Sequence, residues 1–378
     1  MFLKREGDDN MKRLIFVICA LFVLSACTSS QVNTNVSIDE KVPVLFYYGL
    51  TEDGVFVNNT TGADIDDYRL DFFDFQNQKT YPFCTRSNCH HNSKDCQAYQ
   101  MAHFENGTLF TVAAYKDYLY LIYEMSGDNG FDNVGFFIAR CGMDGENIEK
   151  LFERKGGIQI PNYAYIYKDK LIYSYNTLSV TSMGGSTSTV GVLEIYDLDT
   201  KQITNIVNQD LQENRMNLFL GAKDDLIYFI DCDMTTMKKP VYSYDLKTQN
   251  KELVDENCPT DRSTLYQGHL YYADEENNKI ISYDILTHEK KNEAELPEQE
   301  GTLYLSTKGG LVNLRYVSDQ ETYTYIYDVG NKEYILEKSS DWIDLDTKFN
   351  DGYIGTKNNI IGMFSDDLEF IPFVEIVT

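Results

Sequence analysis

Short runs of alternating apolar and polar residues recur from Pro43 to the end of the chain. Many of them follow a turn rich in Asp, Gly or Lys, as in residues 116–120 (KDYLY) and 223–228 (KDDLIY). Alternation with period two, together with enrichment in Tyr, Phe and Ile, is typical of β-strands. The pattern therefore predicts an all-β domain over residues 43–378, built from many short strands.

Two sequence elements alternate along this domain, and each occurs seven times. The first is a turn followed by a strand, at residues 52–57, 116–120, 168–173, 223–228, 267–272, 308–312 and 350–354. The second is an Asp-containing turn at a strand end, at residues 73–75, 143–145, 196–200, 244–248, 283–287, 327–329 and 365–368. Asp accepts hydrogen bonds from the backbone that follows it, and Gly adopts positive φ without steric cost, so both favour tight turns.

The first element returns every 41–64 residues, a spacing typical of the four-stranded blades of a β-propeller. We predict seven four-stranded blades that begin near residues 43, 100, 157, 213, 260, 300 and 340, with six or eight blades as alternatives. Each blade buries its faces against its neighbours, so the ring has to close. Closure either places residues 44–48 beside residues 370–377 or leaves the last blade to close alone.

Some of these repeats resemble a known propeller family. Residues 270–274 (LYYAD) with 279–284 (KIISYD), and residues 138–145 (IARCGMDG), are similar to repeats of the low-density-lipoprotein-receptor type propeller. Tyr272 stands where that repeat has Trp, and Ala273 where it has Thr. The whole mature chain resembles bacterial surface lipoproteins that carry such propellers. The resemblance implies a propeller at the cell surface and assigns no particular ligand.

The N-terminal segment has the pattern of an export signal. Residues 11–13 (MKR) precede an apolar run too short to span a membrane, and Met11 fits as the start because residues 1–10 are hydrophilic. Residues 24–27 (LSAC) resemble a bacterial lipoprotein lipobox. The resemblance implies cleavage after residue 26 and a diacylglyceryl group on the sulfur of Cys27, whose two acyl chains suffice for stable anchoring. The alternative is an ordinary secretory signal that leaves Cys27 in the mature chain.

Residues 1–26 are therefore expected to be a signal peptide, and residues 27–42, rich in Ser, Thr and Asn, a flexible tether. The chain carries a formal net charge of −26, and −27 without the signal peptide. Such an acidic surface repels nucleic acid and anionic lipid headgroups, which excludes both as ligands. Trp occurs once, at Trp342, which weighs against a glycan site without excluding it, because the 29 tyrosines can also stack on sugars.

A loop at residues 84–99, between the first two predicted blades, contains three cysteines and two histidines. Cys84, Cys89, His91 and Cys96 follow the spacing Cys-x4-Cys-x-His-x4-Cys. Three thiolates and one imidazole form the ligand set of a closed tetrahedral Zn²⁺ site. The alternative is a disulfide between two of these cysteines, with the third free or paired with Cys141, because exported chains usually meet oxidising conditions. Both interpretations stay open at this point.

Other candidate chemistry is sparse, and no catalytic residue is assigned. Residues 184–188 (GGSTS) lack the last Gly of a serine-hydrolase elbow and are predicted to form a surface loop. Acidic residues 64–67 and 128–133 are expected to be solvated turns rather than Ca²⁺ sites. The remaining histidines, His103, His269 and His288, are expected to be surface or hydrogen-bonded residues rather than catalysts. The remaining cysteines, Cys141, Cys232 and Cys258, are expected to be small half-buried hydrophobic residues.

These features favour a non-enzymatic binding or scaffolding propeller on the extracytoplasmic face of a bacterial membrane, held there through Cys27. Propellers recognise ligands with loops at their rims, and the longest loops here are residues 84–99, 126–135 and 177–191. We expect a protein, peptide or glycan ligand. Two alternatives stay open: a cell-wall or glycan-acting hydrolase or lyase with carboxylates at the central opening, and an envelope-assembly or sensing component.

Overall fold

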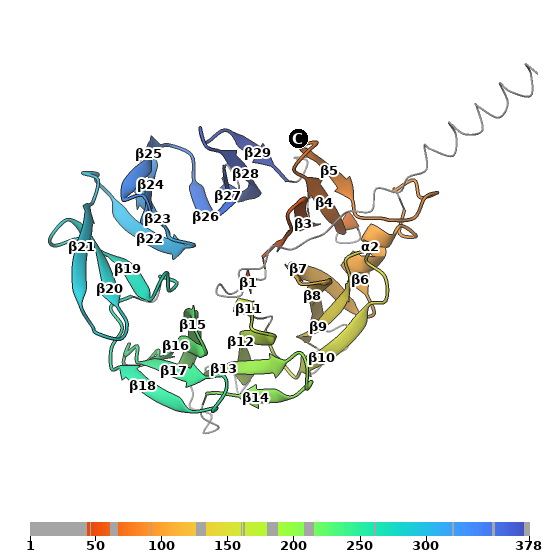
Figure 1. Cartoon of the computed structure of the whole chain (residues 1–378), viewed down its shortest axis with the longest axis horizontal. Coiled ribbons are helices and arrows are strands. Elements are labelled where there is room, and N and C mark those ends of the chain that lie inside the picture. The colour runs from red at the N-terminus through yellow and green to blue at the C-terminus, as the bar shows by residue number, and fades with distance from the viewer. Residues whose placement is uncertain are drawn as a thin grey trace, which may run out of the picture.

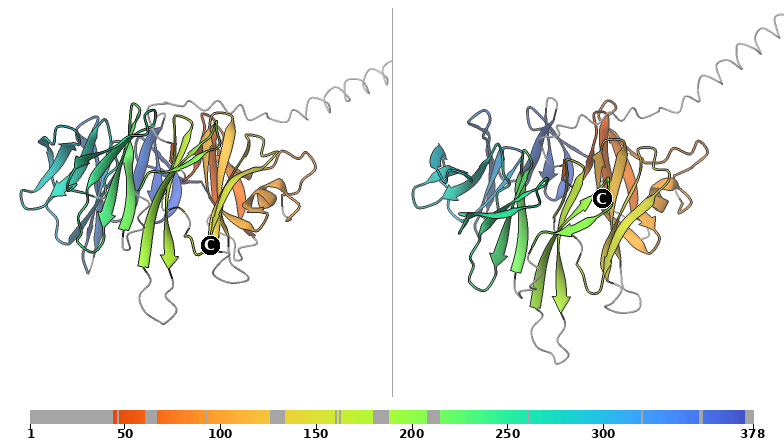
Figure 2. Two further views of the ribbon diagram at one scale, coloured as in Figure 1. Left: turned by 90° about the horizontal axis from the view of Figure 1, so that it is seen from below. Right: turned by 60° about the horizontal axis from the view of Figure 1, so that its bottom comes forward.

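In the computed structural model, β-sheets are arranged as a ring around a central opening (Figure 1). Seen from the side, the ring is a flat disc, and the strands run across its thickness (Figure 2). The structure describes residues 44–45, 47–60, 67–91, 93–125, 134–159, 161, 163–179, 188–207, 215–260, 262–319, 321–349 and 352–373. None of the helices in these ranges is long and apolar enough to cross a membrane. The predicted all-β propeller is confirmed.

Consecutive strands pair antiparallel and form successive groups along the chain. The first groups are β2 (Gly49–Leu50), β3 (Gly54–Asn59), β4 (Arg69–Asp74) and β5 (Lys79–Pro82); then β6 (His103–Phe104), β7 (Gly107–Tyr115), β8 (Tyr118–Met125), β9 (Gly135–Gly142) and β10 (Glu149–Lys155). Next come β11 (Tyr163–Tyr167), β12 (Lys170–Ser179), β13 (Ser188–Asp197) and β14 (Ile203–Asn205); then β15 (Arg215–Lys223), β16 (Leu226–Asp233), β17 (Val241–Asp245) and β18 (Lys251–Asp255). The last are β19 (His269–Asp274), β20 (Lys279–Asp284) and β21 (Lys290–Glu295); β22 (Thr302–Lys308), β23 (Leu311–Val317), β24 (Thr322–Asp328) and β25 (Glu333–Ser339); and β26 (Ile343–Phe349), β27 (Gly352–Lys357), β28 (Ile360–Ser365) and β29 (Phe370–Pro372).

These groups begin two to nine residues after the predicted blade starts. Two features depart from seven separate four-stranded blades. A single parallel pair, Val190 with Arg215, joins the third and fourth groups into one sheet. The group β19–β21 has only three strands in the described residues. The number of seven blades therefore stays a prediction. A short helix, α2 (Gln97–Ala102), lies between the first and second groups.

The two repeated sequence elements form the tight turns of the sheets. Two-residue turns join β7 to β8, β11 to β12, β15 to β16 and β22 to β23, with positive φ at Lys116, Lys168, Asp224 and Gly309. At the outer hairpins, one Asp carboxylate accepts two backbone N–H groups from the residues that follow it. This occurs at Asp74, Asp197, Asp245, Asp284 and Asp328. The predicted turn chemistry is confirmed at these positions.

Aromatic side chains fill the space between neighbouring sheets. The largest fully buried side chains are six tyrosines and six phenylalanines. Some of the buried hydroxyl groups find acceptors: Tyr123 Oη donates to the Met101 carbonyl and Tyr167 Oη to the Asp224 carbonyl, each at 2.7 Å. At these positions tyrosine supplies large apolar area without leaving its polar atom unpaired. This accounts for the abundance of tyrosine in the strands.

The ring closes by side-chain packing between the first and last groups, which lie side by side in Figure 1. Val55 and Phe73 form one buried cluster with Ile354 and Phe373, and the rings of Phe73 and Phe373 are 4.7 Å apart. Within the described residues, the last group, β26–β29, pairs with no strand of the first group. Over those residues the last sheet closes alone, which is one of the two predicted modes of closure.

The residues before β2 lie elsewhere than beside the last sheet. β1 (Val44–Leu45) pairs with β11, near the middle of the ring (Figure 1). Residues 374–377, which entered the alternative mode of closure, lie outside the described residues. The N-terminal segment of the domain thus reaches the central opening instead of the outer edge of a blade.

Candidate functional site

The structure brings together the four side chains predicted to bind a metal. One ligand atom from each of Cys84, Cys89, His91 and Cys96 lies within 4.8 Å of the other three. In a tetrahedral site with Zn–S bonds of about 2.3 Å, two sulfur atoms lie about 3.8 Å apart. The cluster therefore needs only small side-chain movements to surround an ion, and its three sulfurs and one imidazole nitrogen can bind a metal.

The fold of the loop explains why residues so spaced converge. The chain leaves β5, turns back at Arg86–Cys89, where the Cys89 amide donates to the Arg86 carbonyl at 3.2 Å, and enters α2 directly after Cys96. Gln97, buried at the start of α2, accepts a hydrogen bond from the Thr85 amide at 2.9 Å. Its amide nitrogen donates to the Asp144 carbonyl at 2.9 Å, which ties the loop to the turn after β9.

The thiols of the cluster differ in their environments. The backbone amide of His91 donates to Cys89 Sγ at 3.4 Å, and this hydrogen bond lowers the pKa of the Cys89 thiol. Burial raises the pKa of the Cys96 thiol to about 12. His91 Nδ1 lies 3.5 Å from Cys96 Sγ. A bound cation would stabilise all three thiolates together, because metal ligation requires deprotonated sulfur.

Each of the cysteines in the described residues is a free thiol, and these include Cys141. Cys141, Cys232 and Cys258 are buried, as expected of small hydrophobic residues, and none of them belongs to a potential metal-ligand group in the described residues. The arrangement supports a metal-binding cluster at residues 84–96, while the identity of the metal stays a prediction.

A second candidate site is the central opening, which contains a cavity of about 2580 Å³. It is lined by the innermost strands of the ring and by residues 47–52, which precede and include β2. The N-terminal segment could not be assigned to this place from sequence, because nothing in residues 44–50 signals which blade it meets. The lining includes eight tyrosines and the single tryptophan, Trp342.

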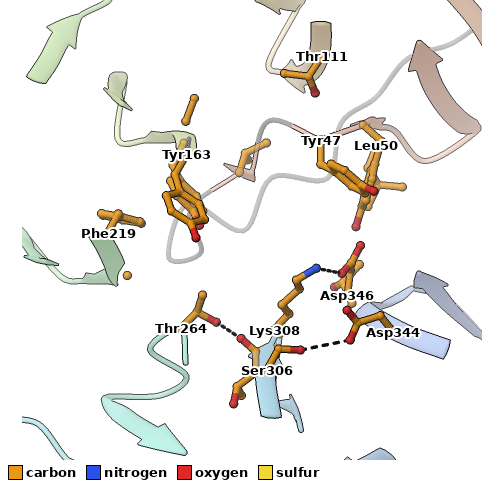
Figure 3. A pocket seen from close by; sticks show the side chains of 18 of the residues that line it. Tyr47, Leu50, Thr111, Tyr163, Phe219, Thr264, Ser306, Lys308, Asp344 and Asp346 are labelled. Atoms are coloured by element: carbon orange, nitrogen blue, oxygen red, sulfur yellow. Dashed lines mark hydrogen bonds and ion pairs between the residues drawn. The ribbon is translucent and has the colours of Figure 1, made fainter. Parts of the chain in front are cut away.

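One wall of the cavity carries charged groups (Figure 3). Lys308 of β22 extends to Asp346 of β26, with Nζ 2.6 Å from Oδ1, and Ser306 Oγ donates to Asp344 Oδ1 at 3.2 Å. The side chain of Asp346 is only 4 % exposed. Its second oxygen, Oδ2, is buried and has no hydrogen-bond partner in the part of the chain that the structure describes.

Burial raises the pKa of Asp346 and outweighs the opposing effect of Lys308. For Lys308 burial acts to lower the pKa, but the carboxylates of Asp346 and Asp344 outweigh it and raise the pKa. Tyr47, from the N-terminal segment, points into the same region (Figure 3), and burial raises its pKa. The cavity thus holds a desolvated carboxylate next to a cation and a phenol.

The other sequence candidates are placed apart from both sites. His269 Nδ1 lies 3.2 Å from the Gln267 carbonyl, and His288 Nε2 lies 3.0 Å from the Val254 carbonyl, as expected of hydrogen-bonded histidines. His103 differs from the expectation, because its Nε2 is buried and has no hydrogen-bond partner among the described residues. Much of the remaining loop sequence lies outside the described residues, namely the lipobox with Cys27, residues 64–66 and 128–133 of the acidic clusters, residues 184–187, and most of the loops 126–135 and 177–191.

No protein-family model matches the chain, and no curated protein matches its sequence. Solved structures similar to this chain include peptidases and the propeller domain of a protease. A structure of prolyl endopeptidases aligns with a TM-score of 0.55 and 12% identity, over 88% of this chain and 48% of that one. A post-proline cleaving enzyme from Rickettsia typhi aligns with a TM-score of 0.55 and 11% identity, over 90% of this chain and 54% of that one.

The β-propeller domain of the trilobed protease from Pyrococcus furiosus, described as having an open velcro topology, aligns with a TM-score of 0.51 and 14% identity, over 89% of this chain and 100% of that domain. The chain spans about half the length of the two whole peptidases. At these identities the likeness shows the propeller fold alone. The low-density-lipoprotein-receptor type and the lipoprotein anchor stay predictions.

Proposed function

We propose that this chain is a membrane-anchored binding protein on the extracytoplasmic face of a bacterial membrane, and that its propeller takes up a ligand in the central cavity. The observation that carries the proposal is the cavity itself, about 2580 Å³ in volume and lined by polar and aromatic side chains. Most small-molecule sites have volumes of roughly 300–1,000 Å³, so this cavity suits an extended ligand.

The proposal is tested by binding of the full chain, purified in mild detergent, to immobilised glycan and peptide libraries. Ser306→Trp places an indole inside the cavity, whereas Thr248→Trp places the same group on an exposed outer turn. We expect a ligand whose binding is lost with Ser306→Trp and kept with Thr248→Trp. Binding that survives Ser306→Trp in a folded protein would move the site out of the cavity.

A hydrolase or lyase is the second candidate, because the buried carboxylate of Asp346 with its raised pKa is the kind of perturbed group found in active sites. Mass spectrometry of each captured glycan or peptide after incubation with the full chain separates the two functions. Unchanged ligand supports the binding protein. Cleavage that disappears with Asp346→Asn supports the enzyme.

Membrane anchoring is proposed from the lipobox-like residues 24–27. Labelled palmitate is expected to enter the chain expressed in bacteria and to be lost with Cys27→Ser, whose product partitions into the aqueous phase with Triton X-114. Equal partition of both proteins would instead support an ordinary secretory signal.

For the cluster of Cys84, Cys89, His91 and Cys96 we propose a structural Zn²⁺ site. The donor set and the convergence of all four ligand atoms support this proposal. Such an ion would fix an excursion that contributes few residues to the core between the sheets, and it leaves no open coordination position for catalysis.

A further inference from the structure

Two arginines of the central cavity converge on one aromatic ring. The guanidinium carbon Cζ of Arg262 lies 5.7 Å from the centre of the Tyr304 ring, and that of Arg315 lies 5.2 Å from the same point. Arg315 also lies over Trp342, with Cζ 3.9 Å from the ring centre. All four residues line the cavity. Tyr304 and Arg315 are direct cross-strand partners of β22 and β23, which fixes their side chains on the same face of the sheet.

These two arginines have no carboxylate partner among the described residues, although acidic residues outnumber basic ones 59 to 33 in the chain. The nitrogen Nε of Arg315 is buried and has no hydrogen-bond acceptor in those residues. Four of the five other arginines in the described part of the chain form an ion pair, namely Arg69, Arg140, Arg154 and Arg215, and the fifth, Arg86, donates to the Asp95 carbonyl and to Gln100 Oε1. A buried donor without an acceptor is costly, which points to an acceptor that a ligand supplies.

The charge of the cavity wall differs from that of the rest of the chain. Six basic and five acidic residues line the cavity, in a chain whose net charge is −26. The pair of Lys308 with Asp346 neutralises one residue of each sign. Lys223 and Lys348 add two lining cations that form no ion pair within the described ranges, so the wall is close to neutral and repels an anion less than the rest of this acidic chain does.

We propose that Arg262 and Arg315 bind the carboxylate of an acidic sugar within the cavity, an inference that rests on the proposed binding function and names its ligand class. The planar guanidinium group matches a carboxylate with two parallel hydrogen bonds. Tyr304 and Trp342, 38 % and 39 % exposed, offer flat apolar faces for the C–H groups of a sugar ring beside those arginines.

The size and polarity of the cavity suit an oligosaccharide of uronic acids. A volume of about 2580 Å³ exceeds what a single monosaccharide fills. Thr264 and Ser306 line the cavity (Figure 3), and their hydroxyl groups donate to the Thr307 carbonyl and to Asp344 Oδ1, which leaves their oxygens able to accept hydrogen bonds from sugar hydroxyls.

The test is isothermal titration of the full chain in mild detergent with oligouronate trisaccharides of glucuronate, galacturonate, mannuronate and guluronate. Each acid is compared with its methyl ester, which removes the negative charge and adds a methyl group. Arg315→Gln and Arg262→Gln are the test variants. Arg140→Gln is the matched control, because Arg140 also stacks on a tyrosine, at 4.7 Å from Tyr118, but is paired with Glu149 and lies outside the cavity lining.

We expect one or more acids to bind while their esters do not, with affinity falling as salt rises. Each test variant is expected to weaken binding about 10- to 100-fold, as for loss of a charge-assisted hydrogen bond, and Arg140→Gln to leave it unchanged. Thermal unfolding of each variant verifies that it is folded, and Arg262→Gln provides an independent result if Arg315→Gln is unfolded.

Three results would overturn the inference. Equal binding of acid and ester would show that the cavity binds the glycan without recognising its carboxylate. The proposed binding function would then still hold. Acid binding that neither cavity arginine affects would place the anion elsewhere. Absence of binding to any oligouronate, or preference for a triglutamate peptide, would exclude acidic sugars as the ligand class. The proposed binding function would then still be tested separately, by the library screen with Ser306→Trp.

Discussion

The ion pair between Lys308 and Asp346 offers a sharp test of the cavity wall, because its two partners differ in exposure. The side chain of Lys308 is 37 % exposed, whereas that of Asp346 is 4 % exposed. Exposed pairs contribute about 1 kcal/mol or less to stability, and breaking a buried pair costs about 3–5 kcal/mol because a buried charge is left unpaired. Lys308→Met is therefore expected to lower the free energy of unfolding by about 3 kcal/mol at pH 8.

The loss is expected to depend on pH in a definite direction. Removing Lys308 takes away the group that opposes the effect of burial on Asp346, so the pKa of this carboxyl rises further above its value in the unfolded chain. A folded state that binds the proton more tightly than the unfolded state loses stability as pH rises from the unfolded pKa through the folded pKa. The deficit of Lys308→Met relative to the natural protein is therefore expected to be small near pH 4.5 and full at pH 8.

Urea unfolding followed by the fluorescence of the single tryptophan, Trp342, measures this deficit at both pH values. Lys201→Met is the control, because Lys201 forms an exposed pair with Glu149, and its removal is expected to cost about 0.5 kcal/mol or less. The double variant Lys308→Met with Asp346→Leu is expected to lose the pH dependence. A loss below about 1 kcal/mol at pH 8, or the same loss at both pH values, would refute the reasoning.

Three further predictions concern closure, turns and the metal cluster. Phe373→Ala, at a fully buried contact between the last and first sheets, is expected to lower the free energy of unfolding by about 3–5 kcal/mol in the same assay, and a loss under about 1 kcal/mol would contradict closure by packing. Asp245→Ala removes the acceptor of two backbone N–H groups and is expected to lower the free energy of unfolding by about 1–2 kcal/mol. Glu252→Ala, on the exposed face of β18, is the control and is expected to leave that free energy unchanged. The full chain, made with zinc and without reductant, is expected to carry about one equivalent of Zn²⁺ by elemental analysis, lost with Cys96→Ser and kept with Cys232→Ser; missing free thiols without metal would instead indicate a disulfide.

The fold was predictable because each repeat is determined by residues that are close together in the sequence. Each inner turn and each Asp turn depends on residues that are neighbours in the chain, such as Asp245 with the amides of Lys247 and Thr248. The cluster at residues 84–96 was predictable for the same reason, since all its ligands come from one loop. Ring closure was left with two alternatives, because it depends on contacts such as Phe73 with Phe373 that join the two ends of the domain.

The central cavity could not be predicted from the sequence. Its residues come from every part of the domain, and Tyr47 and Asp346 meet only because the ring closes. Arg262 and Arg315 also gave no signal, since single arginines next to strands are ordinary, and what distinguishes them is the absence of a carboxylate partner in the described structure. The metal cluster could be recognised because its cysteines and its histidine lie within thirteen consecutive residues. The residues that line the cavity are spread over about three hundred residues, so no local pattern connects them.

The central claim is that ligand recognition takes place inside the ring. An experimental structure of the full chain, determined with a ligand captured in the library screen, tests it most directly. We expect density for that ligand within the cavity, in contact with Tyr304 and Arg315. Density confined to the outer rim or to the loop at residues 84–99, with the central opening unchanged, would contradict it.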